Sequence, residues 1–354
     1  MWNNVIRSQL SLPKVCRIIQ LFERHCRKSY YHSFEQFIPA CSKISVNSKH
    51  NVCIKAAEDP QNKLKLSFLP KIHKVVQLEE DSFAIEVGGD QDEGKQCLIE
   101  VPVQSNLAVA CTANASVEVS NMHAENIGIS TDSGSILTKD IRCGQVLLLT
   151  QGGNIGSRGV LQGNIHLTTR RNGTIECQRI QGRYARIQTE KGDIKSSSSY
   201  CDESYFQTTD GNLTLSNMHR KCNVTISNNG NLRISGLDGS LDATINEGNA
   251  EIQASVLTGD CVIFVKKGDL KLGLLDLELC HLDLSATKVS LPTPLCADDD
   301  RVITVKVGDL TVEKFSNYTI ASNEPKFTLK AACLSGSIHL SVADWIASLK
   351  FMNK

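Results

Sequence analysis

The amino-acid sequence predicts an all-β protein: a β-solenoid whose repeat unit, or rung, is about 19 residues long. Two observations support this fold class. Glycines recur in phase along the middle of the chain, from Gly134 to Gly268. Between them, apolar and polar residues alternate over short segments, which is typical of strands with one buried face. One such unit cannot bury its apolar face alone, so neighbouring units must stack and share a continuous core.

Each rung is expected to contain two short strands and two turns that carry glycine. The first series of turn glycines is Gly134, Gly153, Gly173, Gly192, Gly211, Gly230, Gly248 and Gly268, and the second is Gly144, Gly163, Gly182, Gly239 and Gly259. Glycine suits these turns because it adopts a positive φ without a steric penalty. The expected core-facing side chains are Leu213, Leu215, Val224, Ile226, Leu232 and Ile234. An antiparallel β-sandwich also fits the strand lengths, but it does not explain eight glycines in phase.

A small polar residue follows each glycine of the first series. These residues are Ser135, Asn154, Thr174, Asp193, Asn212, Asn231, Asn249 and Asp269. Stacked in register, they would form a polar ladder whose side chains accept backbone N–H groups at the turns. A calcium-binding stack would need closely repeated aspartates and a nine-residue period. We therefore expect a structural ladder and no metal site.

The domain organisation follows from where the repeat is regular. Residues 1–43 form a basic leader, and residues 44–128 form a less regular N-terminal β cap. The solenoid repeats span 129–340 with an irregular insertion near 273–305, and two further copies of the glycine motif follow at Gly308 and Gly336. Residues 341–354 form a C-terminal cap segment. There we expect a short helix beginning at Asp344, whose Trp345, Ile346 and Leu349 would cover the open end of the solenoid, because unpaired strand edges promote aggregation.

The leader is rich in basic residues although the whole chain has a net charge of zero. Residues 1–34 contain six Lys and Arg residues against one acid, Glu23. Val15, Ile18, Ile19 and Phe22 would line one face of a helix. This combination is typical of a mitochondrial transit peptide, and a cytoplasmic protein with a disordered leader is the alternative. No apolar run approaches the length of a transmembrane helix, and the zero net charge argues against a nucleic-acid partner.

The 14 cysteines are scattered, and no pair has the C-x-x-C spacing of a zinc or redox motif. Cys177 occupies the inward position that leucine or isoleucine occupies in other rungs. A free cysteine behaves as a small hydrophobic residue, so we expect reduced thiols in the core. Glycosylation sequons occur at Asn114, Asn172, Asn212, Asn223 and Asn317. Without a secretory signal they carry no functional weight.

No catalytic or nucleotide-binding motif is present, and the nine histidines are dispersed. We therefore predict no catalytic residue, no cofactor and no enzyme activity. One cluster could contact an anionic partner, because six arginines lie within 29 residues with only Glu176 to oppose them. The cluster consists of Arg158, Arg170, Arg171, Arg179, Arg183 and Arg186. Such patches bind acidic proteins, nucleic acid or anionic lipid, and the simpler alternative is a solvated strand face.

The motif T-x-x-G-[NDS]-[IL] resembles that of a family known as the "putative adhesin" domain of unknown function. It occurs at Thr131–Ile136, Thr189–Ile194 and Thr208–Leu213. The resemblance covers residues 100–340 and implies a β-solenoid without catalytic residues. The leader and the ending Asp344–Lys350 also resemble an animal family called family with sequence similarity 185.

The sequence thus predicts a non-enzymatic β-solenoid that serves as a scaffold or binding surface for an unidentified protein partner, in mitochondria. Two other classes of function stay open. A carbohydrate-active enzyme on a β-helix would need carboxylates that stack in a groove. A surface adhesin is disfavoured by the basic leader and the free cysteines.

Overall fold

The computed structural model describes residues 33–57, 62–67, 72–88, 96–275, 280–292, 303–310, 313–320 and 327–342. Every regular element within these ranges is a β-strand. The predicted leader helix and the predicted C-terminal helix at 344–349 lie outside the described residues, so both stay predictions. Strand β1 (Ser33–Phe37) lies inside the segment 1–43, and Phe34 packs against the core, so the folded part begins before residue 44.

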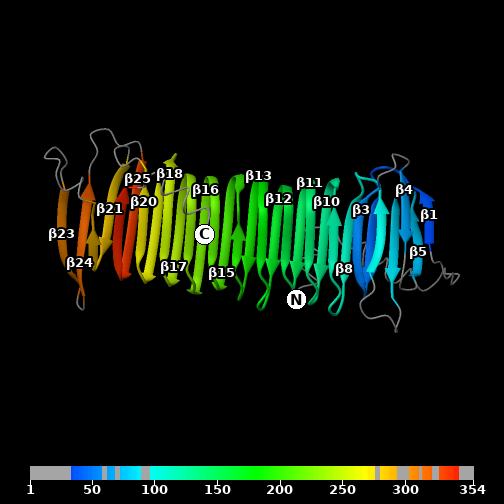
Figure 1. Ribbon diagram of the computed structural model, residues 1–354, viewed down its shortest axis with the longest axis horizontal. Helices are drawn as coiled ribbons and strands as arrows, with labels where there is room; N and C mark the ends of the chain where they lie inside the picture. The colour runs from blue at the N-terminus through cyan, green and yellow to red at the C-terminus, as the bar shows by residue number, and fades with distance from the viewer. Residues whose placement is uncertain are drawn as a thin grey trace.

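The strands stand side by side and form one long column (Figure 1). In its centre, consecutive rungs pair in parallel, and their register advances by one repeat: Leu213 pairs with Leu232, and Leu215 pairs with Ile234. The predicted all-β, solenoid-like fold is therefore confirmed. The central strands are β8 (Asn106–Cys111), β9 (Val117–Ser120), β10 (His123–Thr131), β11 (Ile136–Thr150), β12 (Ile155–Thr169), β13 (Ile175–Thr189), β14 (Ile194–Ser196), β15 (Ser199–Asp210), β16 (Leu213–Asn229), β17 (Leu232–Glu247), β18 (Ala250–Leu257), β19 (Cys261–Lys267) and β20 (Leu270–Leu274).

Each long strand is interrupted at two places and so covers more than one face of the column. In β11 the first face runs from Ile136 to the irregularity at Asp140, which has a φ of 50°. A second irregularity lies between Arg142 and Gln145, and the second face runs from there to Thr150. Side chains alternate between core and solvent on both faces. All six residues predicted to face the core are at most 2% exposed. The hydrophobic effect therefore acts along the whole length of the column, because every rung adds its apolar side chains to one shared core.

The glycine turns stack directly on one another, and this stacking explains why they are glycines. A Cβ atom on Gly153 would overlap the carbonyl oxygen of Gly134 in the preceding rung. The same overlap with the preceding glycine would occur at Gly192 and Gly230. The expected reason was a positive φ, but none of these three glycines has one, so that explanation is wrong for them. What excludes a side chain at these positions is the close approach of two backbones.

Two ladders of polar groups hold the glycine turns together. The predicted ladder is present: Asn212 Oδ1 accepts the backbone N–H of Asn231 at 3.0 Å, and Asn231 Oδ1 accepts that of Asn249 at 2.9 Å. The second ladder consists of the buried threonines of the T-x-x-G motif. Thr131 Oγ1 donates to the carbonyl of Gly134 in its own turn at 2.6 Å, and Thr169 Oγ1 donates likewise to Gly173 at 2.7 Å. Thr189 Oγ1 donates to the carbonyl of Gly173 in the preceding rung at 2.9 Å. Buried turn carbonyls thus gain partners that water cannot supply.

The two ends of the column are built by modules that fold back. The N-terminal module comprises β1, β2 (Lys43–Ser48), β3 (Asn51–Ala56), β4 (Lys63–Ser67), β5 (Ile72–Glu79), β6 (Ser82–Val87) and β7 (Gln96–Val101). Its β2 and β3 pair in parallel with β8 and β9 of the central column and also with β6 and β7. β4 and β5 add antiparallel strands outside them. The first rung in the sequence is therefore not the outermost rung in space.

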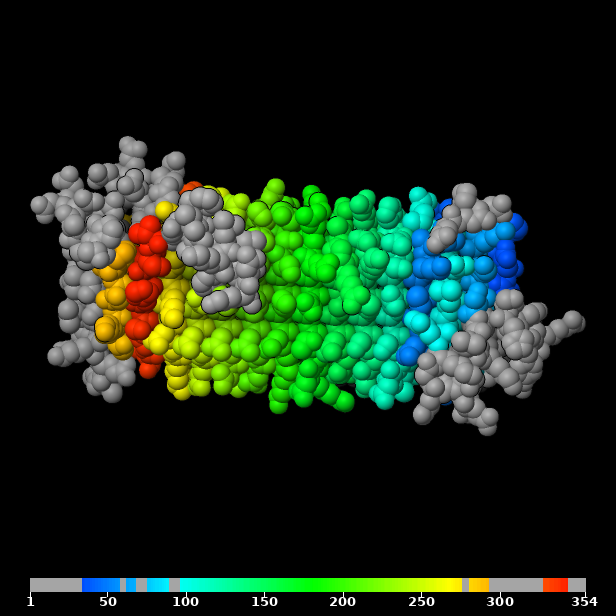
Figure 2. All heavy atoms as spheres, in the orientation of Figure 1, coloured from blue at the N-terminus to red at the C-terminus, as the bar shows by residue number. Residues whose placement is uncertain are grey.

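The C-terminal module has the same arrangement. It comprises β21 (Cys280–Ala286), β22 (Lys288–Ser290), β23 (Ile303–Leu310), β24 (Glu313–Ile320), β25 (Phe327–Ser335) and β26 (Ser337–Val342). β25 lies between β19 and β21, and β26 lies between β20 and β22. Figure 2 shows this last rung as a red band between its yellow and orange neighbours. Gly308 was expected to begin a rung, but it lies in the antiparallel β23–β24 pair. Gly336 instead stacks on Gly268.

The core thiols are buried, as predicted. Cys97, Cys111, Cys177, Cys201 and Cys222 are each at most 3% exposed. Burial is the largest cause that raises the pKa of Cys177 and Cys222 to about 12, because the thiolate would lose its hydration. These thiols are therefore protonated and unreactive at neutral pH.

We expect alkaline pH to destabilise the fold. A thiol with a pKa of 9.0 in the unfolded chain and about 12 when folded leaves stability unchanged below pH 9 and lowers it between pH 9 and 12. Each such thiol contributes about 1.4 kcal/mol per pH unit within this window. Urea unfolding between pH 7.5 and 10.5 measures the slope. Cys177→Val should make the slope shallower, whereas Cys41→Ser, at an exposed position, should leave it unchanged. Equal slopes in both variants would contradict this account.

Candidate functional site

The second face of the central column carries a group of aromatic and charged side chains on neighbouring rungs. The register places His166, Arg186 and Tyr205 on three successive strands, β12, β13 and β15. The ring of Tyr184 lies beside them, with its centroid 5.7 Å from that of His166 and 5.3 Å from that of Tyr205. We call this region the Arg–Tyr surface. It consists of His166, Tyr184, Arg186, Glu203, Tyr205 and Lys221.

Within the Arg–Tyr surface, Glu203 is neutralised by its neighbours. The Tyr205 hydroxyl donates to Glu203 Oε1 at 2.6 Å, and Lys221 Nζ lies 2.6 Å from the same oxygen. The hydrogen bond from Lys221, followed by that from Tyr205, lowers the pKa of Glu203 and keeps it ionised. The bond to Glu203 is also the main cause that raises the pKa of Tyr205, so this phenol stays protonated. The Glu203–Lys221 pair therefore adds no net charge to the surface.

Arg186 is the positive charge of the Arg–Tyr surface that remains once Lys221 is paired with Glu203. It makes no ion pair within the described part of the chain. When the Gln188 amide is turned so that its oxygen faces Arg186, the guanidinium donates to this oxygen at 3.1 Å. Burial, followed by the nearby charge of Arg186, lowers the pKa of His166, so this imidazole is neutral at neutral pH. The Arg186 guanidinium is thus a planar cation on the same surface as the rings of His166, Tyr184 and Tyr205.

The structure distributes the six predicted arginines over several parts of the column. Arg158 lies on the first face of β12, and Arg186 lies on the second face of β13. Arg170 and Arg171 lie at the glycine turn, where Glu190 is 3.8 Å from Arg170 Nε. The remaining two, Arg179 and Arg183, lie between the first and second faces of β13, and Arg183 is next to Gly182. Only Arg186 belongs to the Arg–Tyr surface, and a binding role for the other five stays a prediction.

A second aromatic group lies between the first and second faces. The Tyr200 ring stacks on His219 with centroids 4.5 Å apart, and Arg179 Cζ lies 5.4 Å from the centroid of Tyr200. His219 Nδ1 in turn lies 3.1 Å from Asp238 Oδ2. Since Tyr200 already has these two partners, we interpret the group as a ladder that stabilises neighbouring rungs.

The carboxylates at outward positions beyond the first face of the central rungs include Glu203 on β15 and Asp242 on β17. A glycosidase needs two carboxylates near the scissile bond. β16 separates Glu203 from Asp242, and Glu203 is engaged by Lys221. The described residues also hold no cluster of three or more His, Cys, Asp or Glu side chains that could bind a metal ion.

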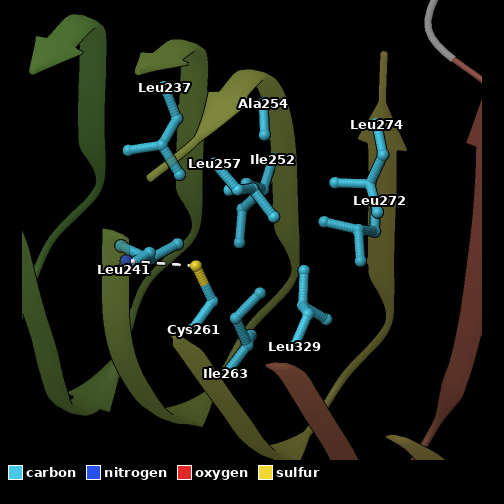
Figure 3. A pocket seen from close by; sticks show the side chains of 10 residues that line it. All are labelled: Leu237, Leu241, Ile252, Ala254, Leu257, Cys261, Ile263, Leu272, Leu274 and Leu329. Atoms are coloured by element: carbon cyan, nitrogen blue, oxygen red, sulfur yellow. Dashed lines mark hydrogen bonds between the residues drawn. The ribbon is translucent and has the colours of Figure 1, made fainter. Parts of the chain in front are cut away.

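An apolar seam occurs in the core near the C-terminal end of the central column (Figure 3). Leu237, Leu257, Ile263 and Leu329 are among the side chains that line it, and the seam has no room for a water molecule. Across it the backbone N–H of Leu241 points at the sulfur of Cys261 at 3.3 Å (Figure 3). The seam is a packing feature and offers no space to a ligand.

The sequence pattern indicated Arg186 and Tyr184, but it was not used to place His166 and Tyr205 beside Arg186. The signal was present, since adding one repeat of 19 or 20 residues to His166 leads to Arg186 and then to Tyr205. Reading the sequence rung by rung at equal phase would have brought these residues together. The diagonal contact of Tyr184 depends on side-chain directions, which a repeat alignment does not give.

Comparison with known proteins gives a family match for part of the chain. A family model described as "Toastrack DUF4097" matches residues 160–299, which is fewer than half of the chain. No match was found among curated protein sequences. The resemblance to the animal family named above is not among these findings and stays a prediction. Within the described residues, no helix is long and apolar enough to cross a membrane.

Solved structures from Parabacteroides and Bacteroides match most of this chain at low sequence identity. A "putative adhesin" from Parabacteroides merdae is 10% identical at a TM-score of 0.37, over 87% of this chain and 95% of its own. A "putative adhesin" from Bacteroides fragilis is 10% identical, with a TM-score of 0.26, and the match covers 89% of this chain and 98% of that one. A "putative lipid binding protein" from Parabacteroides distasonis is 8% identical, with a TM-score of 0.31, and the match covers 87% of this chain and 96% of that one. Similarity at this level carries no argument about what this chain binds.

Proposed function

We propose that this chain is a non-enzymatic binding scaffold that recognises a protein partner through the Arg–Tyr surface. The observation that carries the proposal is Arg186, a cation without an ion pair in the described chain, set among Tyr184, Tyr205 and His166. Arginine and tyrosine are the residue types enriched in the energetic centres of protein interfaces. A flat sheet face with such a centre suits a folded partner better than a small molecule, which prefers a concave site.

The rigidity of the column supports this role. Arg186 and Tyr205 project from parallel strands whose neighbours on both sides fix their spacing. The Glu203–Tyr205 hydrogen bond and the contacts of Tyr184 with two rings restrict the side chains further. A pre-ordered surface loses little conformational entropy when it binds, which favours affinity.

Proximity labelling in cells, with the native N-terminus kept, tests the proposal. We expect a Tyr184→Ala, Arg186→Ala variant to lose specific neighbours that the wild type labels. A Lys195→Ala, Thr214→Ala variant on the first face serves as the matched control and should keep them. In a purified complex with such a neighbour, the surface variant should bind at least 30-fold more weakly, the effect of losing one energetic centre.

The outcomes separate the alternatives. Identical neighbours for both variants, with equal thermal stability, would contradict the proposal. Loss of binding to anionic vesicles in the surface variant alone would make a lipid headgroup the ligand instead. The labelled neighbours also report the compartment, and mitochondrial neighbours would support the proposal that the basic leader directs import.

A further inference from the structure

The C-terminal module is joined to the central column by two strand pairings, β25 with β19 and β26 with β20, and by one chain crossing. Within the described residues, β25 pairs with β19 over six positions and β26 pairs with β20 over five. β21 and β22 pair only with strands of the module itself, as do β23 and β24. The chain passes between the two parts once, between Leu274 and Cys280. Separating β25–β26 from β19–β20 therefore frees the whole module without breaking any of its internal pairs.

The contacts across this joint are specific. Gly336 fits against the carbonyl oxygen of Gly268, where a Cβ atom would overlap. The backbone N–H and the hydroxyl of Ser337 both donate to Asp269 Oδ1, at 2.8 and 2.7 Å. The backbone N–H of Thr328 donates to Asp260 Oδ1 at 2.8 Å. A strand of unrelated sequence would not supply the glycine, the serine hydroxyl and the matching register together.

Apolar side chains are exposed around the same joint. Val256 of β18 is 53% exposed, Leu275 after β20 is 37% exposed, and Val342 at the end of β26 is 48% exposed. β18, β20 and β26 are neighbours, so these residues lie at the ends of three adjacent strands. Val262 of β19, 48% exposed, lies on a strand that the joint also uses. These apolar side chains therefore lie on, or directly after, the strands that form or flank the joint.

We propose that the C-terminal module is exchangeable, and that the partner at this joint is a second copy of the same chain. In the exchanged dimer, β25–β26 of each copy pairs with β19–β20 of the other, so every contact of the joint is formed again. A second copy is the one occupant that brings Gly336, Ser337 and the register together. Because the element is identical in both copies, exchange replaces each contact of the joint by the same contact between two copies.

Cross-strand cysteines on the solvent side test the exchange. Lys271 and His339 are register partners across the joint, and both are exposed. Chains that carry Lys271→Cys and differently tagged chains that carry His339→Cys are co-refolded from urea in a Cys41→Ser background and then oxidised. We expect a disulfide-linked dimer that contains both tags. Lys195→Cys with Thr214→Cys is the matched control, because these residues hold the same register positions on central rungs that cannot exchange.

Three further results support or contradict the exchange of the C-terminal module between copies. A single chain with both Lys271→Cys and His339→Cys should form an internal disulfide, and its failure to do so would contradict the β20–β26 register on which the proposal rests. Each single variant refolded with the wild type should give no dimer. If the internal disulfide forms but the mixed chains give no more dimer than the central-rung control, the exchange does not occur and the proposal is wrong.

Discussion

Gly153→Ala is expected to lower the free energy of unfolding by about 3–5 kcal/mol, whereas Gly152→Ala, one residue earlier, should change it by less than about 1 kcal/mol. At Gly153 an added Cβ would overlap backbone atoms of Gly134, which lie in a hydrogen-bonded neighbouring rung and cannot turn away. At Gly152 the nearest atoms are Arg171 Cδ at 3.8 Å and Ser133 Oγ at 3.9 Å, an ordinary contact. Urea unfolding followed by circular dichroism measures both variants.

The pair of variants also separates two explanations of the glycine repeat. If glycine were needed only for a positive φ, Gly153→Ala would be harmless, because Gly153 does not have one. If close stacking is the cause, Gly192→Ala should be as damaging as Gly153→Ala, since a Cβ atom at either position would overlap the carbonyl oxygen of the glycine one rung earlier. Similar stabilities for Gly152→Ala and Gly153→Ala would refute the stacking explanation.

Leu232→Asp is expected to unfold the column or to cost at least about 4 kcal/mol. Leu232 is 1% exposed and lies in register between Leu213 and Ala250, so the carboxylate would be buried without a partner. The matched change is Thr214→Asp on the solvent side of the first face. Its register partners are Lys195 and Arg233, which attract a carboxylate, so stability should change by no more than about 0.5 kcal/mol.

Thermal and urea unfolding of both aspartate variants provide the measurement. The inward and outward assignments are independent of any ligand, so the test concerns the fold alone. Comparable losses of stability in Leu232→Asp and Thr214→Asp would show that the alternation of buried and exposed positions has been assigned wrongly.

The regular part of the fold could be predicted because its information is local. Each rung repeats the same alternation and the same turn, so Leu213, Leu232 and their equivalents identify the core without any long-range knowledge. The polar ladder followed from the same phase. The reason for the glycines could not be read from one turn, because the atom that excludes a side chain at Gly153 belongs to the previous rung.

The ends and the surface needed the structure for a different reason. Ser337 pairs with Asp269 across 68 residues of sequence, and the intervening copy of the motif at Gly308 belongs to an antiparallel pair instead. Nothing in the motif itself distinguishes Gly308 from Gly336. On the surface, the clustering of arginines in sequence overstated their proximity, because Arg158 and Arg186 lie on different faces of the column.

The fold-back of the C-terminal module has a consequence during protein synthesis. The partner of Asp269 is Ser337, so the ribosome must add 68 further residues before the edge of β19 and β20 can be closed by its own strand. At about 5–20 residues per second this edge stays open for roughly 3 to 14 s on every nascent chain. The N-terminal end has no such delay, because β2 and β3 are already made when β8 and β9 emerge. On a polysome, neighbouring nascent chains therefore present the same open edge to one another at the same stage of synthesis.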